Sequence, residues 1–148
     1  MQLTQEAWGE ISRHAQETFP EECCGLVFAV GNADFVVRVQ NIQNRLHALD
    51  PETYPRTAAI AYAMDPLELD QVIRQSEQSG RRLKAFYHSH PDHPAKWSPT
   101  DLAEAHWTGC SYVITSVEKG NAVLTNSFRL AGPEESKFFE DESIEFAD

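Results

Sequence analysis

Residues 82–91, with the sequence RLKAFYHSHP, define one strand and the point at which it has to end. The run is rich in apolar and aromatic residues and closes on Pro91, which cannot continue the hydrogen-bond ladder of a central strand. Side chains alternate between the two faces of a strand, so His88 and His90 project to one side while Tyr87 points to the other, into the core. A fold for this chain must therefore place two imidazoles together at a strand end.

The rest of the chain mixes helical and strand patterns. Pro20 marks the end of one helical pattern, and the Asp65-Pro66 pair and Gly80 are suited to start and close another. Helices mixed with hairpins imply an α/β or α+β fold, a mixed β-sheet with helices packed on it. The predicted helices cover residues 3–19, 65–80 and 98–107. The predicted strands cover 24–30, 34–42, 82–90, 111–117 and 122–130, with hairpin turns around 31–32 and 119–121. Residues 57–64 are ambiguous between strand and helix, and we favour a strand; residues 43–56 are predicted to form a loop.

Composition favours one compact globular domain. The 148 residues, 41% of them hydrophobic, can bury a core without disulfides or a structural metal. The net charge of -11 argues against a nucleic-acid partner, because such proteins usually carry a basic stripe. No apolar run approaches the ~20 residues of a membrane span, and the N-terminus lacks the basic start and apolar run of a secretion signal. We therefore expect a cytoplasmic protein with no membrane partner; the sequence leaves the oligomeric state open.

The C-terminal end of the chain is acidic. Residues 134–148 contain seven acidic residues and a single cation, Lys137. A run of like charges is usually a solvated face. We therefore divide the chain into a domain of residues 1–132 and an acidic tail of residues 133–148, which can include an edge strand.

The cysteines do not indicate a disulfide framework. Their number is odd, and Cys23 and Cys24 are adjacent, so a reducing compartment fits. A cysteine nucleophile is an alternative, but CCGLVF is more typical of the beginning of a buried strand, in which cysteine behaves as a small apolar side chain.

Beyond the two histidines, the segment SPTD has the residues of a helix start. Ser98 is a good N-cap, Pro99 suits the first helical position and Asp101 the first turn, so capping alone explains the segment. Yet residues three apart on a helix face the same way, so Ser98 and Asp101 would both meet whatever lies over this helix end. Two histidines, one carboxylate and an open fourth position are the ligand set of a catalytic zinc, whereas a structural zinc site is closed and usually contains cysteines.

A zinc-dependent hydrolase of carbonyl compounds also needs a base that takes a proton from water and passes it to the leaving amine. Glu21 and Glu22 directly precede the strand at 24–30, which can lie beside the histidine-bearing strand. Carboxylates ahead of a strand are usually only solvated, so their position alone leaves their role open.

Together these segments resemble the JAMM signature of the MPN-domain metalloproteases. In that signature a glutamate lies two residues before a cysteine or similar small residue, which is followed by a glycine; EECCG matches this part. Far downstream the signature continues with HxH, a spacer of seven residues, a serine, two further residues and an aspartate. HSH and SPTD match this second part. The order of elements also resembles the family over nearly the whole chain. The resemblance implies the MPN/JAMM fold, whose layout is related to that of cytidine deaminases, in a stand-alone prokaryotic form.

The resemblance implies a role for each matching residue. His88, His90 and Asp101 would be zinc ligands, Glu22 the general base, and Ser98 a donor that stabilises the oxyanion. By the same alignment Glu21 is a neighbour of the base rather than its counterpart. His93, three residues beyond His90, could complete an all-histidine triad, but it falls where the spacer of the family is variable. Trp97 is expected to be a packing wall beside the site.

The implied activity is amide hydrolysis by a zinc metalloprotease or isopeptidase. Family members cleave at the C-terminal tails of ubiquitin or ubiquitin-like proteins, and some stand-alone prokaryotic members trim ubiquitin-like sulfur carriers. Cleavage after the C-terminal Gly-Gly of such a carrier is therefore the implied reaction, by analogy.

Three other classes compete with this interpretation. A non-enzymatic MPN-type interaction scaffold is the main alternative, but such scaffolds typically lack the ligand residues that this chain keeps. A zinc-dependent deaminase needs HxE and PCxxC, and neither occurs. A structural zinc domain would need paired cysteines at zinc spacing.

Overall fold

The computed structural model describes the whole chain, Met1–Asp148. Its strands are β1 (Gln2–Thr4), β2 (Cys24–Val30), β3 (Ala33–Val39), β4 (Arg82–Pro91), β5 (Ser111–Glu118), β6 (Asn121–Ala131), β7 (Phe138–Glu142) and β8 (Glu145–Ala147). Its helices are α1 (Gln5–Thr18), α2 (Gln43–Leu49), α3 (Pro66–Gln78) and α4 (Pro99–Glu104), with a 3-10 turn η1 (Glu134–Ser136). None of the helices has the length and apolar character that crossing a membrane requires.

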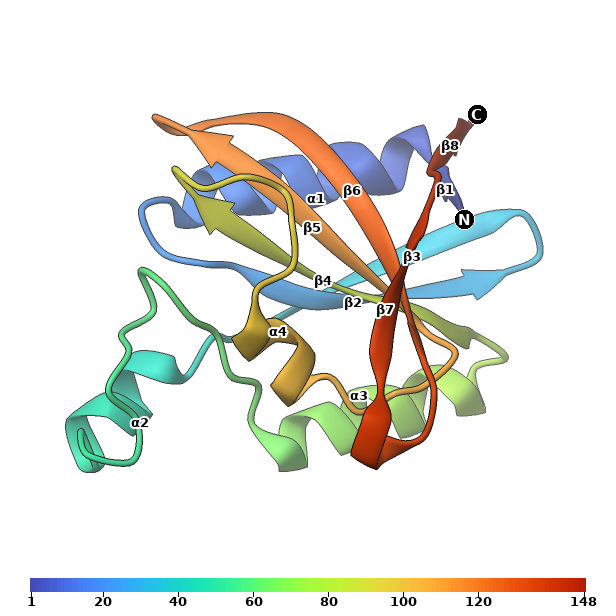
Figure 1. Ribbon diagram of the computed structural model, residues 1–148. Coiled ribbons are helices and arrows are strands. Elements are labelled where there is room, and N and C mark those ends of the chain that lie inside the picture. Colours follow the sequence, from blue (N-terminus) through green and yellow to red (C-terminus); the bar gives the residue numbers. More distant parts are fainter.

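A six-stranded mixed sheet forms the centre of the molecule (Figure 1). Its strand order is β3-β2-β4-β5-β6-β7. The β4 and β5 strands are parallel, and every other neighbouring pair is antiparallel. The predicted fold class, a mixed sheet flanked by helices, is confirmed, as are the two hairpins that join β2 to β3 and β5 to β6.

Helices cover both faces of this sheet, and each face has its own core (Figure 1). Because both faces of β2 are buried, its sequence is a continuous apolar run rather than an alternating one. On one face the buried residues of α1 pack on residues of the sheet. The helix contributes Ala7, Ile11 and Ala15, and the sheet contributes Val27, Ala85, Tyr87 and Val113. On the other face α3 packs through Ile73 against Leu26, Phe28, Phe86, Tyr112 and Leu130.

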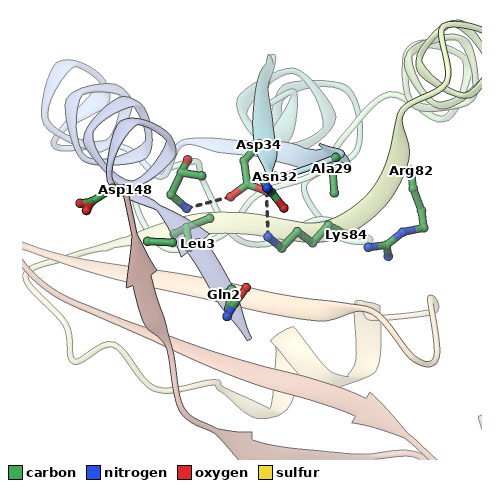
Figure 2. A pocket seen from close by; sticks show the side chains of 11 residues that line it. Gln2, Leu3, Ala29, Asn32, Asp34, Arg82, Lys84 and Asp148 are labelled. Atoms are coloured by element: carbon green, nitrogen blue, oxygen red, sulfur yellow. Dashed lines mark hydrogen bonds and ion pairs between the residues drawn. The ribbon is translucent and has the colours of Figure 1, made fainter.

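A bulge near the beginning of β4 turns Lys84 towards α1. The register between β2 and β4 shifts between Val27 and Phe28, so Lys84 has no partner in that ladder. Lys84 Nζ donates to Asp34 Oδ1 at 2.8 Å, and the Thr4 backbone N–H donates to Asp34 Oδ2 at 2.8 Å. The pair lines a hollow of about 530 Å³ (Figure 2) at the opposite end of β4 from the histidines. The role of the Lys84–Asp34 pair in the structure is to connect β1 and the start of α1 to the sheet.

Residues 57–64 form no strand, so the prediction made from their apolar composition is wrong. Their backbone is held by the side chain of Asn41 instead of by a neighbouring strand. Asn41 Nδ2 donates to the carbonyl oxygens of Glu22 at 2.9 Å and Ala61 at 3.1 Å, and Asn41 Oδ1 accepts from the Ala63 N–H at 3.1 Å. Two isolated backbone bonds, from the Glu22 N–H to the Ala58 carbonyl and from the Ile42 N–H to the Ala63 carbonyl, complete the arrangement without a strand ladder. No periodicity in the segment could indicate it.

The loop predicted for residues 43–56 is also corrected, because its first half is the helix α2. The helix has 7 residues and no side-chain cap at its N-terminus, so the sequence offers no start signal. The buried side chain of Gln43 holds it, donating from Nε2 to the Arg56 carbonyl at 3.0 Å.

Two predicted helix boundaries move inwards. The first helix starts at Gln5 rather than at residue 3, because residues 2–4 form β1. The third helix, α4, ends at Glu104 rather than at residue 107, because Ala105 has an extended backbone with φ -86° and ψ 123°.

The acidic tail contributes a strand to each of two sheets. β7 pairs with β6 and forms an edge of the main sheet, while β8 pairs in parallel with β1. Acidic residues in β7 suit an exposed edge, because charge there discourages pairing with another chain. The tail also contacts the core, since the partly buried Phe139 packs against Phe128 and Tyr112.

Tyr87 lies across Gly25 of β2 and points away from His88, into the core as predicted. Its side chain is buried, and its hydroxyl lies 2.7 Å from His14 Nδ1. A Cβ added to Gly25 would lie 2.4 Å from the Tyr87 ring. The glycine therefore leaves the space that the ring occupies.

We predict that Gly25→Ala destabilises the protein by about 1–3 kcal/mol, because overpacking forces a buried ring to shift. The matched control is Gly9→Ala in α1, where an added Cβ meets only Arg13 Nη1 at 3.4 Å. That variant should gain about 0.5–1 kcal/mol from helix propensity. Urea unfolding curves measure both, and a Gly25→Ala variant as stable as the wild type would contradict the packing argument.

Candidate active site

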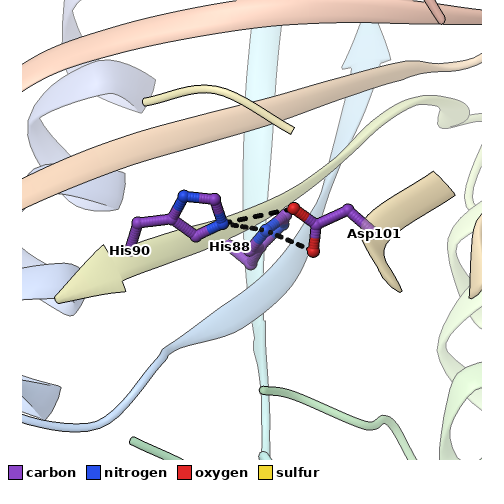
Figure 3. A group of neighbouring side chains, drawn as sticks. All are labelled: His88, His90 and Asp101. Atoms are coloured by element: carbon purple, nitrogen blue, oxygen red, sulfur yellow. Dashed lines mark hydrogen bonds and ion pairs between the residues drawn. The ribbon is translucent and has the colours of Figure 1, made fainter. Parts of the chain in front are cut away.

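His88, His90 and Asp101 converge on one point (Figure 3). The Nε2 atoms of the two histidines are 3.1 Å apart. Asp101 Oδ1 lies 3.2 Å from His88 Nε2, and Asp101 Oδ2 lies 3.3 Å from His90 Nε2. One potential ligand atom from each residue therefore faces a common centre.

The spacing of these atoms fits a single small metal ion. Ligand atoms bound at about 2.0–2.1 Å in a tetrahedron are about 3.3 Å apart. The two histidine nitrogens are 3.1 Å apart, and they lie 3.2 and 3.3 Å from the two different carboxylate oxygens of Asp101. His90 Nδ1 lies 2.8 Å from the Pro94 carbonyl oxygen. A carbonyl only accepts, so Nδ1 carries the hydrogen and the lone pair of Nε2 is free to point at the centre. The spacing and the tautomer of His90 therefore fit a metal ion held by His88, His90 and Asp101.

The two histidines and the aspartate come from elements of different character. His88 and His90 lie on one face at the end of β4, a strand with neighbours on both sides. Asp101 lies in the first turn of α4, within a capping box: Asp101 N–H donates to Ser98 Oγ at 3.1 Å, and Ser98 N–H donates to Asp101 Oδ2 at 2.9 Å. The helix cap and the convergent cluster use the same residues.

Glu22 reaches this site through the pairing of β2 with β4. Cys24 lies opposite His88, and continuing the antiparallel register places Glu22 across from His90. Ser89 fixes the alignment, because its Oγ accepts from the Cys23 N–H at 2.8 Å and its N–H donates to the Cys23 carbonyl at 3.2 Å.

The Glu22 side chain is buried without a partner. It is 5% exposed, and its Oε1 has no hydrogen bond. Burial raises the pKa of Glu22 to about 8, although His90 opposes the shift. The side chain lines a cleft of about 290 Å³ together with His90, Ser98 and Asp101. A perturbed carboxyl group in a cleft is typical of a proton-transfer residue.

The protonation states of Asp101 and His88 suit metal binding. For His90, burial opposes the charged form, but Asp101 and the Pro94 carbonyl outweigh it and raise the pKa. Burial opposes ionisation of Asp101, but its contacts with His88 and His90 outweigh burial and hold the pKa of Asp101 well below its usual range. Burial lowers the pKa of His88. An ionised carboxylate and a neutral imidazole are the forms that bind metal ions.

Tyr62 and Arg56 line the same cleft and were missed by sequence reasoning. The Tyr62 ring stacks on His88 with centroids 4.4 Å apart. Arg56 donates to Thr100 Oγ1, and it is the only lysine or arginine that lines the cleft. Tyr62 lies in the segment wrongly predicted as a strand, and Arg56 lies in the segment predicted as a loop because it has no periodicity. No sequence signal therefore indicated either residue.

The remaining candidates lie around the cluster. His93 lines the cleft but stands outside the group of three, and its Nδ1 lies 2.8 Å from the Asp92 carbonyl. Trp97 packs against Phe139, with ring centroids 5.6 Å apart. Glu21 is exposed and accepts a hydrogen bond from the Asn44 side chain.

The buried cysteines next to Glu22 are not activated. Burial raises the pKa of Cys23 to about 11 and holds that of Cys24 far above its usual range. Their thiols are therefore protonated, which leaves the nucleophile hypothesis without support.

The fold and the cluster of His88, His90 and Asp101 define an α+β domain. In it a strand end and a short helix present two histidines and an aspartate beside a buried glutamate. Residues 4–131 match the family of prokaryotic homologs of the JAB domain. The chain belongs to this family, and the resemblance to stand-alone prokaryotic JAMM/MPN proteins is confirmed.

Two relatives have descriptive names. Over 120 residues the chain is 31% identical to a desampylase from Haloferax volcanii, an alignment that covers 78% of this chain and 80% of the relative. Over 74 residues it is 40% identical to a probable TtuB-protein conjugate cleaving protease from Thermus thermophilus, covering 50% of this chain and 49% of the relative.

Solved structures show the same fold. A protein from Desulfitobacterium hafniense superimposes with a TM-score of 0.72 at 24% identity, over 99% of this chain and 92% of the other. A protein from Salinibacter ruber gives 0.66 at 28% identity, over 100% and 92% of the two chains. A JAB1/MPN domain protein from Archaeoglobus fulgidus gives 0.59 at 13% identity, over 100% of both chains.

The burial of Glu22 predicts a pH dependence of stability in the metal-free protein. The pKa rises from 4.5 to about 8 on folding, so the folded state binds more protons between these values. The contribution of Glu22 is fully present below about pH 4.5 and is lost as the pH rises through about 8. Glu22→Gln should therefore become increasingly more stable than the wild type from pH 5 to pH 9.

Melting temperatures measured in the presence of a chelator test this expectation. Glu21→Gln is the control, and its difference from the wild type should stay flat over the same range. A flat difference for Glu22→Gln as well would show that the Glu22 side chain is solvated.

Proposed function

We propose that this chain is a zinc-dependent amide hydrolase, a JAMM-type metalloprotease or isopeptidase that cleaves after the C-terminal Gly-Gly of a ubiquitin-like or sulfur-carrier protein. The observation that carries the proposal is the unpartnered, buried carboxyl group of Glu22 beside the convergent His88, His90 and Asp101. The names of the two relatives, a desampylase and a protease that cleaves TtuB-protein conjugates, support the choice of substrate.

In this proposal His88, His90 and Asp101 hold the metal. When bound, zinc supplies Lewis acidity at the scissile carbonyl and lowers the pKa of water. Glu22 takes a proton from the attacking water and delivers it to the leaving amine. Its lack of a partner in the protein keeps one oxygen free for that transfer.

Ser98 is suited to stabilise the oxyanion. Its Oγ accepts the Asp101 N–H, which fixes the position of the hydroxyl group, and it makes no other hydrogen bond. Its own hydrogen is therefore free to donate into the cleft that Ser98 lines with Glu22.

The shape of the cleft supports a Gly-Gly tail. The metal ligands, Glu22 and Ser98 all line or adjoin one cleft of about 290 Å³ and have to reach one carbonyl group. A residue without a side chain lets the backbone approach them closely. A carrier protein with a flexible C-terminal tail can extend such a segment into the cleft.

The alternative of a non-enzymatic scaffold explains less. Burying a carboxyl group without a hydrogen-bond partner costs free energy, and a scaffold would gain nothing in return. The convergence of two imidazole nitrogens at 3.1 Å likewise needs a shared ligand or proton between them.

Metal analysis tests the ligand assignment. The purified protein should hold about one zinc per chain, and His88→Ala, His90→Ala and Asp101→Ala should each lower its zinc content, because a site with an open position has only three protein ligands. His93→Ala is the matched control and should keep its zinc. A His93 variant that loses zinc while the Asp101 variant keeps it would overturn the assignment.

Cleavage of a carrier protein extended beyond its Gly-Gly tests the reaction. Mass spectrometry should show one product ending in Gly-Gly, and a zinc chelator should abolish its formation. Glu22→Gln should keep zinc and fold but lose at least ~10²-fold in rate, since general acid–base catalysis typically contributes that much or more. Glu21→Gln should be nearly silent.

Replacing the Gly-Gly of the carrier by Val-Val supplies the counter-test. Equal cleavage of both carriers would contradict the argument that the tail needs residues without side chains to approach the site. A Glu21 variant that is inactive beside an active Glu22 variant would show that the alignment of EECCG is wrong by one residue.

A further inference from the structure

The helix α4 carries Asp101 and directly follows Ser98, and apart from Leu102, which is partly buried against the core, it has little of its own to hold it in place. It has 6 residues, none of them buried. A helix this short is marginal in water. Its N-terminal end is capped by Ser98 and Asp101, but the carbonyl groups at its C-terminal end need partners from elsewhere.

Lys137 supplies those partners from the acidic tail. Its Nζ donates to the Ala103 carbonyl at 3.1 Å, to the Ala105 carbonyl at 2.7 Å and to Glu134 Oε1 at 2.9 Å. The side chain is 10% exposed. These bonds use all the hydrogens of the ammonium group and place its charge at the negative end of the helix dipole.

The other end of α4 also contacts the tail. Trp97, the residue before Ser98, packs on Phe139 with ring centroids 5.6 Å apart. Phe139 belongs to β7 and pairs with Leu130 of β6. The two contacts therefore start from Lys137 and Phe139, which are two residues apart in the tail, and Phe139 is fixed by the main sheet. Together they hold both ends of the segment that carries Asp101.

We propose that Lys137 is a positioning residue that holds α4, and through it the Asp101 carboxylate, against the two histidines. The inference rests on the proposed function only for the identity of the centre as a metal site. It also accounts for a feature of the tail, whose single cation is nearly buried while all of its acidic residues except Glu142 are exposed. In this proposal the tail is part of the site rather than a solvated appendage.

Zinc affinity of the substrate-free protein, measured by competition with a chromogenic chelator, tests the proposal. Lys137→Met keeps most of the aliphatic stem and removes the donors, and it should weaken zinc binding about 10-fold or more, as loss of a residue that orients a ligand typically does. Lys119→Met is the matched control: it makes the same change in charge at an exposed hairpin turn and should leave zinc affinity unchanged.

Hydrogen exchange supplies a second measurement that needs no metal. In Lys137→Met the amides of Leu102 and Ala105, which are bonded within and just after α4, should exchange at least several-fold faster, while β5 keeps its protection. Lys137→Gln, which retains a shorter donor, is measured in parallel and should show smaller changes in the same direction, so the test does not depend on the folding of one variant.

The outcomes separate this proposal from the proposed function. Zinc affinity and α4 exchange equal to those of the wild type in both Lys137 variants would overturn the positioning role and leave the zinc hydrolase intact. Uniform loss of protection over the whole chain would also overturn it, since it would show a general stabilising role. A wild-type protein that binds no zinc would overturn the proposed function and this inference together.

Discussion

The antiparallel pairing of β2 with β4 is the contact on which the site depends. It places Cys24 opposite His88, and Ser89 locks the register by bonding both backbone groups of Cys23. A slip of one residue would turn every side chain of β4 to the opposite face. The histidines would then lie in the core under α1, and Glu22 would lose its place across from His90. Because both faces of these strands are buried, such a slip is strongly opposed by the two cores.

The fixed register of β2 and β4 allows the sheet to hold an arrangement of polar groups that is unfavourable in free energy. Two imidazole nitrogens 3.1 Å apart and a carboxyl group that is 5% exposed with an orphan oxygen are unfavourable in isolation. They persist because backbone pairing, not their own interactions, determines where they lie. A site of this kind is preorganised, since its polar groups do not have to move or lose water when a substrate carbonyl arrives.

What could be predicted from sequence follows from how local each feature is. The pair His88 and His90 and the cap that holds Asp101 are specified within a few residues, so spacing alone indicated them. Glu22 is distant in sequence, and only a signature that spans the chain singled it out. Asn41, Tyr62 and Arg56 act through contacts with segments far away, without periodicity or motif, and no local reasoning could find them. The same cause underlies the wrong strand at 57–64, where the Asn41 side chain and isolated backbone bonds hold the segment in place of a ladder.

The site is asymmetric in how firmly its parts are held. The histidines sit on a central strand, whereas the aspartate sits on a helix of 6 residues with no buried side chain. The Asp101 carboxylate also has two roles. Both of its oxygens face the histidines, and one of them, Oδ2, also accepts the hydrogen bond from the Ser98 N–H. Any motion of α4 therefore disturbs the helix cap and the convergent cluster at once. The weakest element of a site limits its precision, so the contacts at the two ends of α4 have more influence on the geometry than further packing around the histidines would have.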